Sequence, residues 1–450
     1  MEWPSVSKQH VYARLHERSL APARGLYTPL LVRKATTRGL LLPLSLAWSV
    51  LLLVVLEATS GGGETSPLFN LSDPYVGPAS FGALIVHGIL CDVDRRRVIV
   101  LRVGVLLEIL RFVLLAHRMV ALDVVVLSTG YGFLVAALAD FLVHREWRSA
   151  ALAALVPVGM ASSRLGLADV VQRLTPLTYD GTLLALDATL RIPFSRLAGI
   201  LFAAVSLVRA LALIAYAALP GAIATGLAYE EYARRRGLSR GVGVNLLLAY
   251  MVSGTIAALL YVWCPATGPA HAFAGLFPRS LPAANTVPLH LAPFAPDSPR
   301  NAMPSLHVAW AILLARSVAG ARSSVRISAW IFAALTILAT LGSGEHYIFD
   351  LVAVAPFLAA LEAATAHRSI SWRRRAPALL SGAALYALLM MIIEKGPATV
   401  SRLEAAPPLA WGLVVITLLI PATFALRQVH SAPGEPLRDH RTPIAFQPDS

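Results

Sequence analysis

The stretch "VGVNLLLAYMVSGTIAALLYV", residues Val242–Val262, decides the fold class, because it holds no charged residue over its whole length. A run of roughly 20 apolar residues is long enough for an α-helix to cross a bilayer. Similar runs are Gly39–Glu57, Met119–Val143, Leu207–Leu227 and Leu409–Leu426. They lack the alternation of apolar and polar residues that marks the strands of a membrane β-barrel. We therefore predict an all-α, polytopic integral membrane protein with about 12 transmembrane helices.

The composition agrees with this class. Of 450 residues, 57% are hydrophobic and 14% are charged, whereas soluble domains carry about 25% charged residues. The formal charge of +13 is typical of lysine and arginine in cytoplasmic loops. No basic region is interleaved with aromatic residues on a soluble domain, so nucleic acid is not an expected partner. Cys91 and Cys264 are predicted on opposite membrane faces, which argues against a disulfide between them and against a metal site.

The charge of the loops orients the second half of the chain. The loops "YARRRGLSR", "GARSSVR" and "HRSISWRRR" are basic and are predicted to be cytoplasmic. The loops Cys264–Met303 and Gly342–His346 then face the other side. We therefore expect a multi-pass protein of the cell membrane. The predicted helices of this half are Leu207–Tyr229, Val242–Trp263, Pro304–Val318, Val325–Leu341, Tyr347–Thr365, Ala376–Ile393 and Leu409–Ala425.

Two features before these helices also carry predictions. Glu108 and Arg111 lie three residues apart within a predicted span, Val98–His117, and are expected to form an ion pair inside the bundle. Residues Ala168–Ser206 contain "LTYDGTLLALDATLRIPF". This mixed segment is predicted to form a loop and a short amphipathic helix on the outer membrane surface.

Two short motifs each contain a histidine. One lies at the start of the predicted helix Pro304–Val318, and the other directly follows the predicted helix Val325–Leu341. The first is "RNAMPSLHVAW", Arg300–Trp310, and the second is "GSGEHYIFD", Gly342–Asp350. Pro304 is a favoured first residue of a helix, which places His307 in the first turn at the non-cytoplasmic face. The next helix returns to the same face, so His307 and His346 are predicted to meet there.

These residues suit phosphoryl transfer. Asp350 follows His346 by four residues, and on a helix the two would share a face. A carboxylate on one ring nitrogen leaves the other free to act as nucleophile, while a second histidine can protonate the leaving oxygen. Ser305, Ser343 and Arg300 are candidate phosphate ligands. A metal site with Glu345 as a third ligand is the alternative, but transfer without metal or cofactor needs fewer assumptions.

The segments "MPSLHVA" and "GEHYIFDL" together resemble the type 2 phosphatidic acid phosphatase superfamily. The Pro-Ser-Leu-His and His-Tyr-x-x-Asp contexts are closest to the branch that includes fungal inositol phosphorylceramide synthase, an inositolphosphotransferase. The resemblance covers roughly Thr178–Ala366 and implies a six-helix core in the C-terminal half. It implies that His346 forms a phosphohistidine, that Asp350 orients it, and that His307 is the general acid.

The sequence departs from the phosphatase branch of that superfamily in its phosphate ligands. The Lys-x6-Arg-Pro motif is missing, and Thr340 occupies the position of an arginine six residues before the second histidine. Both departures favour the phosphotransferase-like branch. The expected substrate is a membrane lipid, namely a phospholipid, isoprenoid or sphingolipid phosphate, and no protein partner is predicted.

The resemblance also divides the chain into segments. We predict a basic cytoplasmic segment (1–39), N-terminal transmembrane helices of unknown role (40–166), a catalytic core (178–366), C-terminal transmembrane helices (376–427) and a cytoplasmic tail (428–450). A lipid phosphate phosphatase, which only hydrolyses, is the alternative activity. A transporter with incidental histidines is an alternative of another class, although the internal repeat typical of transporters is missing from the sequence. A structural scaffold is a third class.

Overall fold

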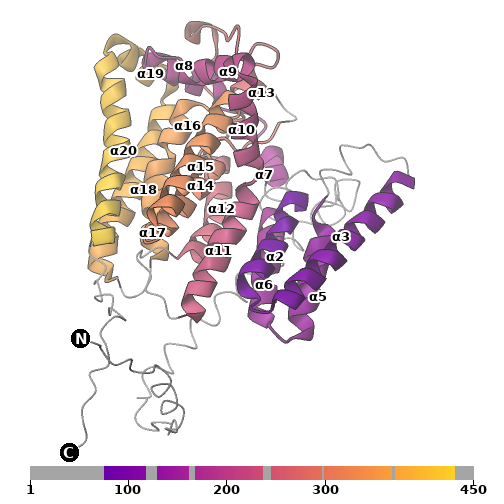
Figure 1. Ribbon diagram of the computed structural model, residues 1–450. Helices are drawn as coiled ribbons and strands as arrows, with labels where there is room; N and C mark the ends of the chain where they lie inside the picture. Colours follow the sequence, from indigo (N-terminus) through magenta and orange to yellow (C-terminus); the bar gives the residue numbers. More distant parts are fainter. Residues whose placement is uncertain are drawn as a thin grey trace, which may run out of the picture. The chain divides into compact units, whose positions relative to one another are not determined.

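The computed structural model describes residues 76–117, 129–161, 168–236, 245–295, 298–366 and 370–430. All of them belong to one compact unit, Leu42–Ser450. These residues form helices without any β-strand beyond an isolated bridge between Thr178 and Ala292, which confirms the all-α prediction for the described part (Figure 1). The predicted segment 1–39, the first predicted span and residues 431–450 lie outside the described residues.

The N-terminal helices are α2 (Val76–Leu90), α3 (Asp94–His117), α5 (Tyr131–Val143) and α6 (Trp147–Ala161). α2 packs against α5, α6 and the later helix α11 (Leu219–Arg235), and α3 packs against α5. The predicted pair is confirmed, because Arg111 Nε donates to Glu108 Oε2 at 2.7 Å. Glu108 Oε1 also accepts from the backbone N–H groups of Gly130 and Gly132 at 2.8 and 2.7 Å, which fastens α3 to the start of α5.

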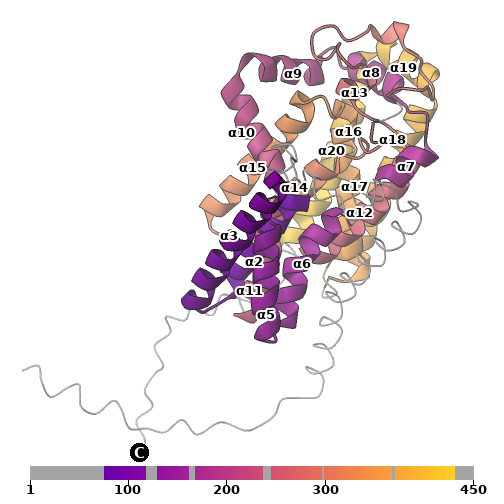
Figure 2. The same cartoon turned by 90° about the vertical axis from the view of Figure 1, so that its right-hand side faces the viewer.

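The remaining helices, α7 to α20, include α14 and α16, which begin beside the two histidine motifs (Figure 2). In chain order the helices besides α11 are α7 (Ala168–Leu174), α8 (Asp180–Thr189), α9 (Phe194–Ala204), α10 (Ser206–Ala217), α12 (Leu246–Trp263), α13 (Pro269–Ala272), α14 (Leu306–Ser317), α15 (Ser323–Gly342), α16 (Ile348–Val352), α17 (Val354–Thr365), α18 (Trp372–Glu394), α19 (Gly396–Ala405) and α20 (Pro407–His430), with a 3₁₀ turn at Ala284–Thr286. α14 packs against α11, α12, α15 and α17, and α17 also packs against α18 and α20.

The described residues contain 4 helical segments that are long and apolar enough to cross a membrane: Leu246–Trp263, Ser323–Gly342, Ile348–Thr365 and Trp372–Glu394. The number rises to 6 if two bent pairs, α9 with α10 at 112° and α19 with α20 at 109°, each form one span. These segments support an integral membrane protein. The predicted total of about 12 spans is not reached by the described residues and stays a prediction.

Three local predictions were wrong. The predicted single helix Leu207–Tyr229 is divided between α10 and α11, and Pro220 lies in the first turn of α11, where a proline that lacks an N–H group is tolerated. α14 begins at Leu306 with Ser305 as its N-cap, so Pro304 precedes the helix, although His307 does lie in the first turn. The third correction concerns α8.

α8 was predicted to lie on the membrane surface, but all of its residues except Ala188 are buried. Its two carboxylates, from Asp180 and Asp187, accept hydrogen bonds from backbone N–H groups of other segments. Buried carboxylates with such partners keep the polar side of a helix inside the protein. α8 is therefore part of the interior that supports the two histidine motifs.

Candidate active site

The two histidine motifs meet in the interior. Ser305 Oγ lies 3.1 Å from His346 Nε2, and both residues are buried. Ser305 is the N-cap of α14, but its side chain makes no capping hydrogen bond. The hydroxyl faces the histidine instead, so the contact joins the start of α14 to the loop between α15 and α16.

Asp350 faces the other side of the same ring. Its Oδ2 lies 3.5 Å from His346 Nδ1, which is longer than a regular hydrogen bond. The same oxygen accepts a hydrogen bond of 2.8 Å from the backbone N–H of Tyr347. Asp350 thus closes the first turn of α16 and holds a carboxylate next to His346.

His307 lies at a more open position than His346. Its ring stacks on Tyr216 of α10, with ring centroids 4.2 Å apart and planes inclined by 17°. The Tyr216 hydroxyl lies 3.3 Å from His307 Nδ1 and 3.4 Å from Glu345 Oε2. His307, Tyr216 and Glu345 are all half-buried. Tyr216 therefore bridges the two histidine motifs, a contact that the sequence analysis missed.

Arg300, which was predicted to bind phosphate, contacts backbone carbonyl groups instead. Its side chain is fully buried, and its guanidinium donates to backbone carbonyl groups of two segments. The acceptors are the carbonyl oxygens of Thr175, Ala295, Ser298 and Pro176, at 3.1, 2.8, 2.6 and 3.4 Å. These contacts fasten the loop before α14 to the end of α7, so they support a structural role for Arg300.

Ser343 is the C-cap of α15, and its hydroxyl donates to the carbonyl of Thr340 at 3.4 Å. The backbone of this loop is tightly packed. Gly344 has φ +76°, and its carbonyl accepts from the N–H of Ala270 at 2.8 Å. Gly268 has φ +92°, and a Cβ there would lie 2.2 Å from the carbonyl oxygen of Glu345. The loop after α12 therefore packs directly on the second histidine motif.

Two carboxylates from α8 contact this motif and its neighbouring loop. Asp180 accepts from the Gly268 N–H at 2.9 Å and from the Tyr347 hydroxyl at 3.0 Å. Asp187 accepts from the N–H groups of Ile348 and Phe349 at 2.9 and 3.3 Å. The sequence analysis missed both residues. Their spacing of seven residues, which places them on one face of a helix, was the available signal.

Burial shifts the ionisation of these groups. It lowers the pKa of His346 to about 4, although the charge of Glu345 opposes the shift. It raises the pKa of Asp187 to about 7, against the hydrogen bond from the Ile348 N–H, and it also raises the pKa of Asp180. Burial removes a group from water and thereby favours its neutral form. His346 is therefore an uncharged imidazole at neutral pH.

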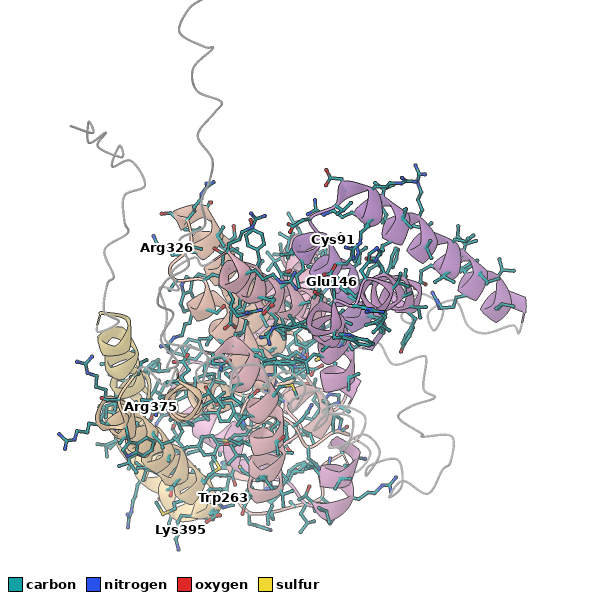
Figure 3. The ribbon with its side chains drawn as sticks, turned by 90° about the horizontal axis from the view of Figure 1, so that it is seen from below. Cys91, Glu146, Trp263, Arg326, Arg375 and Lys395 are labelled. Atoms are coloured by element: carbon teal, nitrogen blue, oxygen red, sulfur yellow. The ribbon has the colours of Figure 1, made fainter. Side chains whose placement is uncertain are left out.

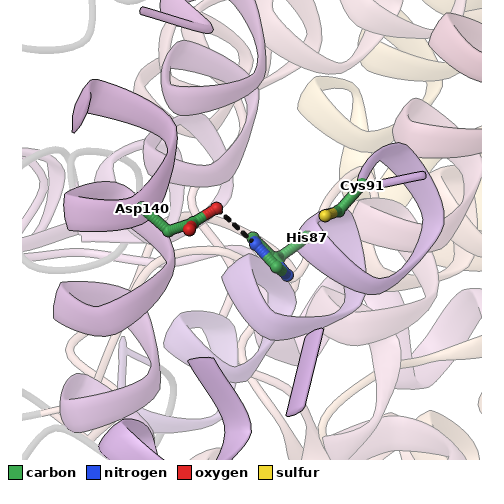
Figure 4. A group of neighbouring side chains, drawn as sticks. All are labelled: His87, Cys91 and Asp140. Atoms are coloured by element: carbon green, nitrogen blue, oxygen red, sulfur yellow. Dashed lines mark hydrogen bonds and ion pairs between the residues drawn. The ribbon is translucent and has the colours of Figure 1, made fainter. Parts of the chain in front are cut away.

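A separate group of potential metal ligands lies among the N-terminal helices. His87, Cys91 and Asp140 each offer one ligand atom, and these atoms lie within 4.8 Å of one another (Figure 4). His87 Nε2 is 2.8 Å from Asp140 Oδ2, and Arg96 donates to both oxygens of the same carboxylate. Because the guanidinium neutralises Asp140, these contacts favour an ion-pair network over a cation site.

Comparison with known proteins gives one match. Residues 181–364 match the model of the PAP2 superfamily. The matched region begins in α8 and includes Ser305, His307, His346 and Asp350. No curated protein and no solved structure matches the chain. Together with the apolar helices, this match over residues 181–364 supports a membrane enzyme of the phosphatase or phosphotransferase kind.

Proposed function

We propose that this protein transfers a phosphoryl group from a lipid-linked donor to an alcohol through a phosphohistidine at His346, in the manner of an inositolphosphotransferase. One observation carries the proposal. A buried, neutral His346 lies between a serine hydroxyl and a carboxylate, and a more open histidine, His307, is connected to the same loop through Tyr216. A nucleophile and a separate acid are what such a transfer requires.

In the first step, the lone pair on His346 Nε2 attacks phosphorus. The bond between phosphorus and the leaving oxygen breaks, and His307 gives that oxygen a proton. The low pKa of His346 keeps the lone pair available. Asp350, 3.5 Å from Nδ1, is placed to hold the proton on that nitrogen and to stabilise the positive charge that develops on the ring.

In the second step, His307 takes the proton of the acceptor hydroxyl, and the acceptor oxygen attacks the phosphohistidine. The P–N bond breaks, and His346 returns to its neutral form. The N-terminus of α14 supports the phosphate in both steps, because the positive end of a helix dipole favours an anion and this end lies beside His346, where Ser305 faces the ring. The Pro-Ser-Leu-His context favours transfer to a lipid or polyol hydroxyl, and water as acceptor would make the enzyme a phosphatase.

The loop charges support a site on the non-cytoplasmic side. α14 runs away from His307 and ends at Ser317, and α15 begins at Ser323 and returns to the loop of His346. The turn between them contains Arg322 and is followed by Arg326. Since basic residues concentrate on the cytoplasmic side, we place the catalytic histidines, His307 and His346, opposite to that turn.

The proposal is tested with the full-length protein in detergent micelles. The donors are short-chain phosphatidylinositol and phosphatidic acid with labelled phosphate, with and without a polyol or long-chain alcohol acceptor. We expect a labelled product that depends on the acceptor, and a labelled protein that loses its phosphate in acid and keeps it in alkali. Free phosphate without dependence on the acceptor would establish the phosphatase alternative.

His346→Ala should abolish both the turnover and the protein label, with a loss of roughly 10⁴-fold or more. The matched control is His290→Ala, which removes an exposed histidine from the loop before α14. Turnover that survives in His346→Ala would contradict the proposed mechanism.

A further inference from the structure

Besides the direct contact between Ser305 and His346, the hydroxyl of Tyr216 makes polar contacts with both catalytic motifs. Tyr216 lies on α10, which packs against α15, while His307 is on α14 and Glu345 is in the loop before α16. These residues are separated in the sequence by 91 and 129 positions. The hydroxyl is within 3.4 Å of both partners, and the ring stacks on the imidazole of His307. The position therefore constrains both the plane of that imidazole and the partner of its Nδ1.

We propose that Tyr216 and Glu345 are positioning residues for His307, and that they hold a proton on its Nδ1 so that the proton on Nε2 is the one transferred to the leaving group. This inference rests on the proposed function and specifies how the general acid works. When His307 is charged, Nδ1–H donates to the Tyr216 oxygen, and the Tyr216 O–H donates to Glu345 Oε2. After Nε2–H has moved to the leaving oxygen, Nδ1–H remains in place, and protons balance.

The hydroxyl of Tyr216 differs from that of a tyrosine that only fills space. Tyr250 on α12 is buried and packs its ring on Trp310 at 5.1 Å, but its hydroxyl has no hydrogen-bond partner among the described residues. Tyr216 instead directs its hydroxyl at two ionisable groups of the site. A half-buried hydroxyl between a histidine and a carboxylate orders the proton positions of both. Tyr250→Phe is therefore a matched control for Tyr216→Phe.

The test uses the dependence of the rate on the leaving group. An alkoxide leaving group needs a proton from the general acid, whereas 4-nitrophenolate leaves without one. The two probes are short-chain phosphatidylinositol and 4-nitrophenyl inositol phosphate, which transfer the same inositol phosphate. For Tyr216→Phe and Glu345→Gln we expect kcat to fall by about 10- to 100-fold with the lipid and by less than about 3-fold with the nitrophenyl ester. Tyr250→Phe should change neither rate.

Equal losses with both probes would mean a merely structural role and would overturn the inference, and so would an unchanged rate with the lipid. Glu345→Gln serves as the second variant if Tyr216→Phe does not fold. Two further variants separate the inference from the proposed function. If His307→Ala shows the leaving-group dependence and Tyr216→Phe does not, only the inference fails. If His346→Ala retains turnover of both probes, the proposed function fails and the inference fails with it.

Discussion

Two sets of buried or half-buried carboxylates in this protein are stabilised in opposite ways. Asp140 and Glu231, in the N-terminal helices and at the end of α11, are paired with arginines. Asp180 and Asp187, in α8 beside the histidine motifs, accept hydrogen bonds from backbone N–H groups and hydroxyls. Carboxylates therefore form ion pairs with arginines among the N-terminal helices and α11, whereas in α8 they form hydrogen bonds with uncharged groups.

The ionisation of the two sets differs accordingly. Burial by itself would raise the pKa of Glu231, but hydrogen bonds from Arg234 and Arg148 outweigh it and lower the pKa to about 2. Burial raises the pKa of Asp187 to about 7, because the backbone N–H groups that oppose it carry only partial charges. A full positive charge at hydrogen-bond distance decides the direction of the shift.

The arginine-paired set links helices that are distant in the sequence. Glu231 on α11 receives Arg148 from α6, and Arg235 reaches both Ser149 Oγ and the carbonyl of Leu90 at the end of α2. Arg96 joins Asp140 and Glu146 in the same way. Cys91 and Glu146 lie at the ends of the N-terminal helices (Figure 3). We infer that this network fixes the N-terminal helices to α11, whereas the α8 set orders the loop of His346.

The largest expected effect is at Asp350 of α16, which lies next to His346 in the region that the α8 carboxylates support. Asp350→Asn should lower kcat by about 10²- to 10⁴-fold, because an amide cannot stabilise the charge that develops on the imidazole. The thermal midpoint of the variant in detergent should stay close to that of the wild type, since Asn can still accept from the Tyr347 N–H. Steady-state turnover of the lipid donor measures the effect. A kcat within 3-fold of the wild type would remove Asp350 from the mechanism.

An intermediate effect is expected on the arginine-paired side. Glu231→Gln leaves Arg148, Arg234 and Arg235 without their shared carboxylate, and the free energy of unfolding should fall by about 1.5–3 kcal/mol. The thermal midpoint in detergent measures the loss. kcat should not change, because Glu231 contacts none of the site residues described above. Glu404→Gln, which changes an exposed carboxylate on α19, is the control. A loss of kcat without a loss of stability would contradict the division between the two sets.

The smallest effect concerns pH. The pKa of Glu231 is lowered in the folded protein, so its contribution to stability is present above about pH 4.5 and is lost as pH falls through 2. The pKa of Asp187 is raised, so its contribution is complete below about pH 3.8 and is lost as pH rises through 7. Asp187→Asn should therefore flatten the decline of stability between about pH 3.8 and pH 7. Thermal midpoints measured across that range would show it, and an unchanged slope would contradict the raised pKa.

The histidine motifs were predictable because their chemistry is local. His346 and Asp350 lie four residues apart, and the motif of His307 precedes two apolar helices, the second of which returns to the same face. The contact between Ser305 and His346 agrees with the prediction that the motifs meet. The roles of His307, His346 and Asp350 remain predictions, as does the division of the chain into segments. The predicted role of Arg300 as a phosphate ligand finds no support in its contacts with backbone carbonyls.

The sequence alone determined the helical membrane class, the pair of Glu108 and Arg111, and the two histidine motifs, because each depends on composition or on residues within one or two turns of helix. Only the tertiary structure decided the burial of α8, the bridge through Tyr216 and the position of Arg300. Each of these depends on pairing across 91 to 167 residues or on desolvation. Short-range spacing encodes which side chains share a helix face, whereas the packing of distant helices determines which of them are buried together.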